Sequence, residues 1–113
     1  MAYVNWTREQ NKAWWRKQTT WVKIEDCELA FISQNYSGKD TEWDKNTILL
    51  MTNWLKANPA KNLPPLLAHH GRIHPYVIDN GYHRYKAYLK AKRIMIPIVL
   101  WNDHDALMPD YPW

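Results

Sequence analysis

Apolar residues along the chain recur at two spacings, one typical of helices and one typical of strands. The first helical stretch opens with a capping-box pattern, Thr7-x-x-Gln10, and carries a narrow stripe of two tryptophans, Trp14 and Trp15, among basic residues. The pattern predicts a Trp-rich N-terminal helix, with residues 1–19 forming an extension that packs its tryptophans on the domain. A helix that binds a partner protein or stacks on nucleic acid is the alternative.

A second helical stretch is longer and more apolar. Between residues 43 and 55 the apolar positions recur at helical spacing, Thr41 or Asp40 can cap the start, and Asn58-Pro59 stops the run. The pattern predicts a core helix.

Four other runs contain β-forming residues and predict strands, at 20–24, 63–68, 73–79 and 96–101. A hairpin turn is expected between the second and third strands, and residues 25–28 are expected to form a turn as well. With a further helix from about Tyr82, these elements predict one α/β (α+β) domain with a small mixed sheet over residues 20–101. Residues 102–113 are expected to form an extended C-terminal tail.

The composition favours a single folded domain in a reducing compartment. The chain has 113 residues, 46% of them hydrophobic, with eight tryptophans and a net charge of +4. Its one cysteine, Cys27, rules out an intramolecular disulfide, and its acidic neighbours disfavour a nucleophilic thiolate. Because no membrane span or signal-peptide core is found, we expect a cytoplasmic protein, in the host cytoplasm if a phage encodes it.

The most informative stretch lies between residues 76 and 101. Strand-forming residues run into Asp79-Asn80-Gly81, and a basic helix begins at about Tyr82. Gly81 can adopt a positive φ, and a helix that starts directly after such a turn leaves its first N–H groups unpaired at the positive end of the helix dipole. His83 and Arg84 stand beside these groups. The turn therefore predicts a site for phosphate or another anion.

Each residue around this turn has a candidate role. Arg84 can make a bidentate contact to phosphate. Asn80 shapes the turn or touches the ligand, and Tyr82 stacks on a base or covers the phosphate. Asp79 is the candidate catalytic residue, as a Mg²⁺ ligand or a base, with a turn-forming contact as the alternative.

The same residues resemble two known families. Gly81-Tyr82-His83-Arg84 is similar to the Gly-Cys-His-Arg segment of sulfiredoxins and, more loosely, to the Gly-Glu-Arg-Arg box of ParB partition proteins. The residues that follow also fit, namely Tyr85, Ala87, Tyr88 and Ile96-Pro97. Upstream, Leu63-Pro64-Pro65-Leu66-Leu67 resembles the Pro-Pro strand of sulfiredoxins, so the resemblance covers about residues 20–101.

This resemblance implies the fold that the two families share, in which the turn binds nucleotide phosphates. The chain is then expected to bind ATP or CTP, with Mg²⁺ as a further cofactor, at Asn80, Gly81, Tyr82, His83 and Arg84. Slow Mg²⁺-dependent hydrolysis or phosphoryl transfer are the candidate enzyme activities. Reduction of a cysteine sulfinic acid is not expected, because the sulfiredoxin catalytic cysteine falls on Tyr82.

Two other functions stay open. A basic stripe of Lys86, Lys90 and Arg93 on the same helix would suit a DNA-binding or ParB-like nuclease module. A phage- or plasmid-type protein that binds and modulates another protein through its Trp-rich helix is the second alternative. No metal site is expected from the histidines near the hairpin, because His69 and His70 are neighbours on a strand and face opposite sides.

Overall fold

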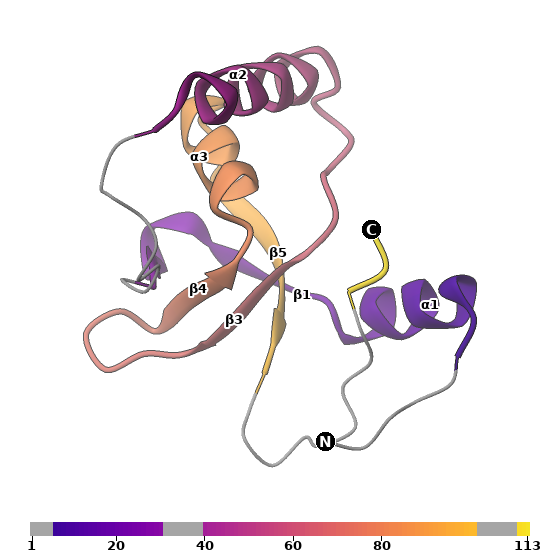
Figure 1. Ribbon diagram of the computed structural model, residues 1–113. Coiled ribbons are helices and arrows are strands. Elements are labelled where there is room, and N and C mark those ends of the chain that lie inside the picture. The colour runs from indigo at the N-terminus through magenta and orange to yellow at the C-terminus, as the bar shows by residue number, and fades with distance from the viewer. Residues whose placement is uncertain (1–5, 31–39, 102–110) are drawn as a thin grey trace.

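The fold is a mixed five-stranded sheet with helices packed on it (Figure 1). The computed structural model describes residues 6–30, 40–101 and 111–113. In chain order the elements are α1 (Arg8–Gln18), β1 (Thr20–Lys23), the short 3₁₀ helix η1 (Ile24–Asp26), β2 (Cys27–Leu29), α2 (Glu42–Ala57), β3 (Leu66–His70), β4 (Tyr76–Asn80), α3 (Tyr82–Lys90) and β5 (Met95–Leu100).

The strands are ordered β1-β5-β3-β4-β2 in the sheet. The β1–β5 and β3–β4 pairs are antiparallel, and the β5–β3 and β4–β2 pairs are parallel. Because β3 separates β4 from β5, the chain leaves β4, forms α3 and crosses β3 before it enters β5. The predicted single α+β domain with a small mixed sheet is confirmed.

Both predicted helix starts have a capping box, which the sequence predicted at Thr7, whereas at Thr41 it predicted only a cap. The Gln10 N–H donates to Thr7 Oγ1 at 3.2 Å, and the Asp44 N–H donates to Thr41 Oγ1 at 3.1 Å. The turn expected over 25–28 is only partly correct, because η1 ends at Asp26 and strand β2 follows at once. No helix among the described residues is long and apolar enough to cross a membrane.

The core lies between the sheet and α3, and α2 packs against α3 and adds Leu55 to it. Helix α3 buries Tyr85 and Tyr88, whereas Leu89 is 43% exposed. The Tyr88 hydroxyl accepts from the Leu63 N–H at 2.9 Å and donates to the Leu63 carbonyl at 3.3 Å. Burial raises the pKa of Tyr88 to about 12, so this hydroxyl keeps its proton and holds the segment before β3.

Helix α1 lies apart from α2 and α3, beside the C-terminal residues (Figure 1). Trp15 is only 2% exposed, and its ring meets the Tyr111 ring edge-on with centroids 5.2 Å apart. Arg8 Nε donates to the Pro112 carbonyl at 2.9 Å, and the Arg16 guanidinium lies over the Trp113 ring. The tail is thus attached to α1 at residues 111–113, while most of the tail predicted over 102–113 lies outside the described residues.

Arg93, between α3 and β5, ties the C-terminal end of α2 to the sheet. Its Nη2 donates at 3.0 Å to three carbonyls, and its Nη1 donates at 3.0 Å to a side-chain amide; the acceptors are Leu55 O, Asn58 O, Lys61 O and Asn62 Oδ1. The last carbonyls of a helix lack intrahelical partners, so this guanidinium satisfies groups that would otherwise depend on water.

We expect Arg93→Ala to lower the free energy of unfolding by about 1 to 2 kcal/mol, because several charge-assisted hydrogen bonds are lost at a partly exposed site. The thermal midpoint should fall by roughly 5 to 10 °C, measured by differential scanning calorimetry. Lys90→Ala, at the exposed end of α3, is the control and should change stability by less than about 0.5 kcal/mol. Equal midpoints for the two variants would contradict the capping role of Arg93.

Candidate functional site

A single residue, Gly81, joins the end of β4 to the start of α3. Its φ of 120° is one that side chains rarely tolerate, and a Cβ there would lie 3.0 Å from Leu66 Cγ and 3.1 Å from Arg84 Nη2. The helix starts without a side-chain cap, and its first bond runs from the Tyr85 N–H to the Gly81 carbonyl at 2.8 Å. The N–H groups of residues 82–84 therefore have no intrahelical partner.

A pocket of about 310 Å³ opens at this helix end. It is lined by one residue of α2 and six consecutive residues of the turn, namely Met51, Asp79, Asn80, Gly81, Tyr82, His83 and Arg84. The structure thus brings the five residues predicted to bind phosphate, and Asp79, to one cavity. The positive end of the α3 dipole lies at the same place.

The guanidinium of Arg84 is buried beside the turn, with only 9% of the residue exposed. Its Nη1 donates to the Pro65 carbonyl at 2.6 Å, to the Pro64 carbonyl at 3.1 Å and to the Tyr111 hydroxyl. The Tyr111 ring also lies 4.7 Å from Cζ, within range of a cation–π contact. Burial lowers the pKa of Arg84 and Tyr111 opposes this shift, so the side chain stays charged.

The two ends of this guanidinium have different surroundings. Nη1 is bound to the protein, whereas Nη2 lies beside Gly81 and makes no hydrogen bond to any residue of the described ranges. The sequence predicted a bidentate contact to phosphate. In the structure Arg84 has a structural contact on one nitrogen and a donor left for a ligand on the other.

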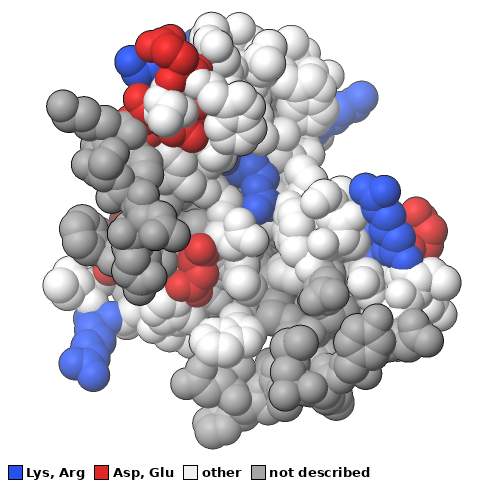
Figure 2. Space-filling view, in the orientation of Figure 1, with Lys and Arg blue, Asp and Glu red and all other residues white. Residues whose placement is uncertain are grey.

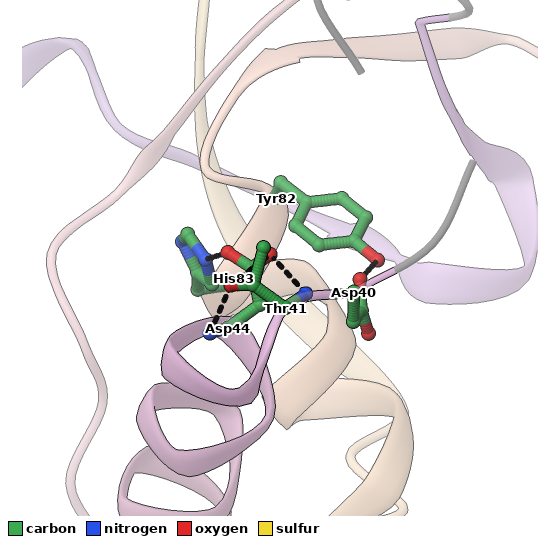
Figure 3. A network of polar contacts seen from close by, with 5 residues as sticks. All are labelled: Asp40, Thr41, Asp44, Tyr82 and His83. Carbon is green, nitrogen blue, oxygen red and sulfur yellow. Dashed lines mark hydrogen bonds and ion pairs between the residues drawn. The ribbon is translucent and has the colours of Figure 1, made fainter. Parts of the chain in front are cut away.

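Tyr82 and His83 are held by carboxylates at the start of α2 (Figure 3). The Tyr82 hydroxyl donates to Asp40 Oδ1, and His83 Nε2 lies 2.7 Å from Asp44 Oδ1. The other Asp44 oxygen accepts from the Thr41 N–H at 2.8 Å and from its hydroxyl at 2.9 Å. The start of α3 is therefore hydrogen-bonded to the start of α2, which the sequence pattern did not indicate.

This network changes the electrostatics of the site. The hydrogen bond from His83 is the largest cause of a lowered pKa for Asp44, and the Thr41 backbone bond adds to it. In the view of Figure 2, basic side-chain atoms lie in a hollow at the centre of the molecule, and acidic side chains lie to the left of this hollow. The turn thus combines a positive helix end with negatively charged neighbours.

Asp79 is paired with a histidine of the adjacent strand. Its Oδ2 lies 2.7 Å from His69 Nδ1, and both side chains are partly exposed. Sequence reasoning considered His69 only as a metal ligand, because the pairing depends on the register. His69 faces Val77 across the β3–β4 pair, so Asp79 is its diagonal neighbour on the same face. Among the described residues, no group of three or more ligating side chains could hold a metal ion.

The predicted basic stripe is interrupted in the structure. Lys90 is exposed, and Lys86 is half-buried with its Nζ 5.8 Å from the centre of the Tyr82 ring. Arg93 instead donates to backbone carbonyls at the end of α2. The stripe therefore offers two lysines rather than three free cations.

Cys27 lies away from solvent in β2. Burial is the main cause that raises its thiol pKa to about 11, with Asp26 as a second cause. Its Sγ donates to the Lys23 carbonyl at 3.5 Å. The sequence argument named the acidic neighbours as the reason for a weak nucleophile, whereas the structure makes burial the larger one.

No protein-family model matches the chain, and no curated protein matches it significantly. Among solved structures, the chain is similar to the C-terminally truncated chromosome-partitioning protein ParB from Caulobacter crescentus in complex with CTP-gamma-S, at 20% identity and a TM-score of 0.58. The match covers 80% of this chain and 47% of that one, so the chain spans about half the length of that ParB structure.

It is also similar to sulfiredoxin from Arabidopsis thaliana, at 14% identity and a TM-score of 0.53. This match covers 74% of this chain and 84% of that one. The two similarities show that the chain has the ParB/sulfiredoxin-like fold predicted from its sequence.

The His83–Asp44 contact should make the free energy of unfolding depend on pH in the acidic range. Because the folded pKa of Asp44 lies below its unfolded value of about 3.9, the stabilisation is present above about pH 4 and is lost as pH falls through the folded value. Asp44→Asn should therefore lower the melting temperature at neutral pH and show a smaller acid-induced fall than the parent.

The measurement is a series of thermal melts between about pH 2 and pH 7. Glu42→Gln is the control and should keep the acid-induced fall of the parent, because the ion pair of Glu42 with Lys45 is exposed and contributes little to stability. If Asp44→Asn and the parent show the same pH profile, the contact does not stabilise the fold.

Proposed function

We propose that this chain, which has the fold of ParB and sulfiredoxin, is a nucleotide-binding domain that holds the phosphates of ATP or CTP on the turn from Asn80 to Arg84. The observation that carries the proposal is the uncapped start of α3, which opens into a pocket of about 310 Å³. The CTP-gamma-S in the similar ParB structure is further support, because it belongs to a protein of the same fold.

The turn offers three kinds of donor to a phosphate. The N–H groups of residues 82–84 would bind its oxygens, and the helix dipole would favour its negative charge. Arg84 Nη2 would add a charge-assisted bond without moving, because Nη1 is fixed by the Pro64 and Pro65 carbonyls. The pocket volume is at the lower end of the range for small-molecule sites, so the phosphates would occupy the pocket and the nucleobase would lie outside it.

Negative side chains near the turn make a cation part of the proposal. Asp79 lines the pocket, and Asp40 and Asp44 hold Tyr82 and His83, so a triphosphate alone would be repelled. Mg²⁺ prefers oxygen ligands and keeps several waters. With Asp79 as a protein ligand, the ion would take its other ligands from phosphate and water, and it would arrive with the nucleotide.

Hydrolysis or phosphoryl transfer is the catalytic form of this proposal. In this form Asp79 would act as the base instead of binding Mg²⁺. Water or an acceptor hydroxyl would attack the terminal phosphorus, its proton would pass to Asp79, and the nucleoside diphosphate would leave. His69, 2.7 Å from Asp79, would orient that carboxylate. A carboxylate is a weak base at neutral pH, so such a reaction would be slow.

The DNA-binding alternative has less support. Arg93 is used at the end of α2, which leaves Lys86 and Lys90 as the basic residues of the stripe. Two phosphate contacts would give only a shallow dependence of affinity on salt.

We expect CTP or ATP with Mg²⁺ to raise the melting temperature of the parent and to give saturable binding in isothermal titration calorimetry. Gly81→Ala should weaken that binding at least about tenfold, because a side chain at φ 120° strains the turn that presents the N–H groups. Lys90→Ala is the control, with unchanged affinity. Arg84→Ala would be a poor test of binding, because it also removes the hydrogen bonds that Arg84 donates to the Pro64 and Pro65 carbonyls and so weakens the fold.

Arg84→Lys keeps the charge and serves as the second variant. It should bind nucleotide more than tenfold more weakly, because an ammonium cannot serve the proline carbonyls and a phosphate at once. Absence of binding of CTP, ATP and pyrophosphate to the folded parent would overturn the proposal. A folded Gly81→Ala variant with parental affinity would place the site elsewhere.

The chain is not expected to reduce a cysteine sulfinic acid. Tyr82 cannot form the sulfur intermediate of that reaction, and Cys27 is buried with a pKa of about 11, so its thiolate is a minor form at neutral pH. The assay supplies a hyperoxidised peroxiredoxin with ATP and Mg²⁺, and no thiol should be recovered. Recovery by the parent that is lost in Cys27→Ser would contradict this expectation.

A further inference from the structure

Trp43, near the start of α2, is a large aromatic ring that lies in solvent beside the pocket. The residue is 66% exposed, and its ring meets the ring of His83 edge-on, with centroids 5.1 Å apart and planes 87° apart. His83 is one of the residues that line the pocket. In an edge-on pair one ring covers at most one face of the other, so the Trp43 ring stands next to a wall of the pocket and keeps an open face.

A row of residues along α2 also connects Trp43 to the pocket. Trp43, Thr47 and Met51 follow one another at intervals of four residues, so each is the surface neighbour of the next. Thr47 is half-buried, and Met51 lines the pocket. A ligand that extends out of the pocket along this row therefore reaches the Trp43 ring.

Tyr82, the other aromatic side chain that the sequence suggested for a base, is already engaged. Its hydroxyl donates to Asp40, its ring meets the His83 ring edge-on with centroids 5.4 Å apart, and Lys86 Nζ lies 5.8 Å from its ring centre. Tyr82 is half-buried as well, whereas Trp43 is exposed. Trp43 thus offers the more open ring of the two.

We propose that Trp43 stacks on the nucleobase and that the preferred ligand is a purine nucleotide; this inference rests on the proposed nucleotide-binding function. With the phosphates on the turn from Asn80 to Arg84, the base lies outside the pocket, where the open face of Trp43 is available. Stacking on an aromatic side chain strengthens with the ring area of the base, so a purine gains more than a pyrimidine.

The starts of the two helices set the direction of the nucleotide. The start of α3 has no side-chain cap and attracts phosphate, whereas the start of α2 is capped by Thr41. The acids on either side of Trp43, Glu42 and Asp44, are paired with a lysine and a histidine. The start of α2 therefore has no excess positive charge for a phosphate, but it can accept an uncharged base.

Isothermal titration calorimetry with ATP, CTP and pyrophosphate, each with Mg²⁺, tests the proposal. The parent should bind ATP roughly three- to tenfold more tightly than CTP. Trp43→Ala removes an exposed side chain and should keep the fold. It should weaken ATP binding about tenfold and CTP binding less, and it should leave pyrophosphate binding unchanged, because pyrophosphate has no base to stack.

Two further variants serve as controls. Trp43→Phe keeps an aromatic ring and should retain ATP affinity within about threefold. Trp54 is 39% exposed on the same helix, about three turns from Trp43 and outside the residues that line the pocket. Trp54→Ala should therefore bind all three ligands like the parent.

The outcomes separate this inference from the proposed function. Unchanged ATP affinity in Trp43→Ala, with a parent that binds pyrophosphate, would overturn the stacking role and leave the phosphate site in place. An equal loss of ATP and pyrophosphate affinity would also overturn it, because the ring would then act through His83. Equal affinity of the parent for ATP and CTP would exclude the purine preference. A parent that binds none of the three ligands would overturn both proposals.

Discussion

The buried guanidinium of Arg84 is the interaction on which the rest of the site depends. A cation that is 9% exposed needs acceptors, and no carboxylate among the described residues is paired with it. The Pro64 and Pro65 carbonyls and the Tyr111 hydroxyl supply them. One side chain of α3 thus fixes the segment before β3 and the end of the chain, and it keeps a positive charge beside Gly81.

That arrangement explains why the start of α3 can be both rigid and positive. Gly81 brings the backbone close to Leu66 and to Arg84 Nη2, which leaves no room for another side chain at the turn. The helix dipole and the guanidinium then act on the same small cavity. Arg84 has no acidic partner among the described residues, and an anionic ligand would balance its charge.

Helix α2 gives the site its opposite charge. The two aspartates at its start hold Tyr82 and His83, so the positive floor of the pocket is bordered by carboxylates. The buried face of the same helix contributes Ile48 and Leu55 to the core, while its outer face stays apolar and exposed. One helix therefore anchors the fold, sets the electrostatics of the turn and presents a surface to solvent, and each task uses a different arc of its circumference.

The sequence by itself determined the local features of this protein. The Thr7 capping box, the cap at Thr41, the helix stop at Asn58-Pro59 and the glycine turn before α3 depend on residues close together in the chain, and they form as predicted. The fold class followed from the order of these elements and from the resemblance around Gly81. These features could be predicted because capping, periodicity and a positive φ are properties of short segments.

Only the tertiary structure decided which side chains are free to act. Arg84 and Arg93 look alike in the sequence, yet one lies beside the pocket and the other caps α2, because their partners are 19 to 38 residues away. The His69–Asp79 pair depends on the strand register, and the carboxylates that hold Tyr82 and His83 depend on how α2 packs against α3. Such contacts join distant segments, so no local pattern encodes them and only packing in three dimensions sets them.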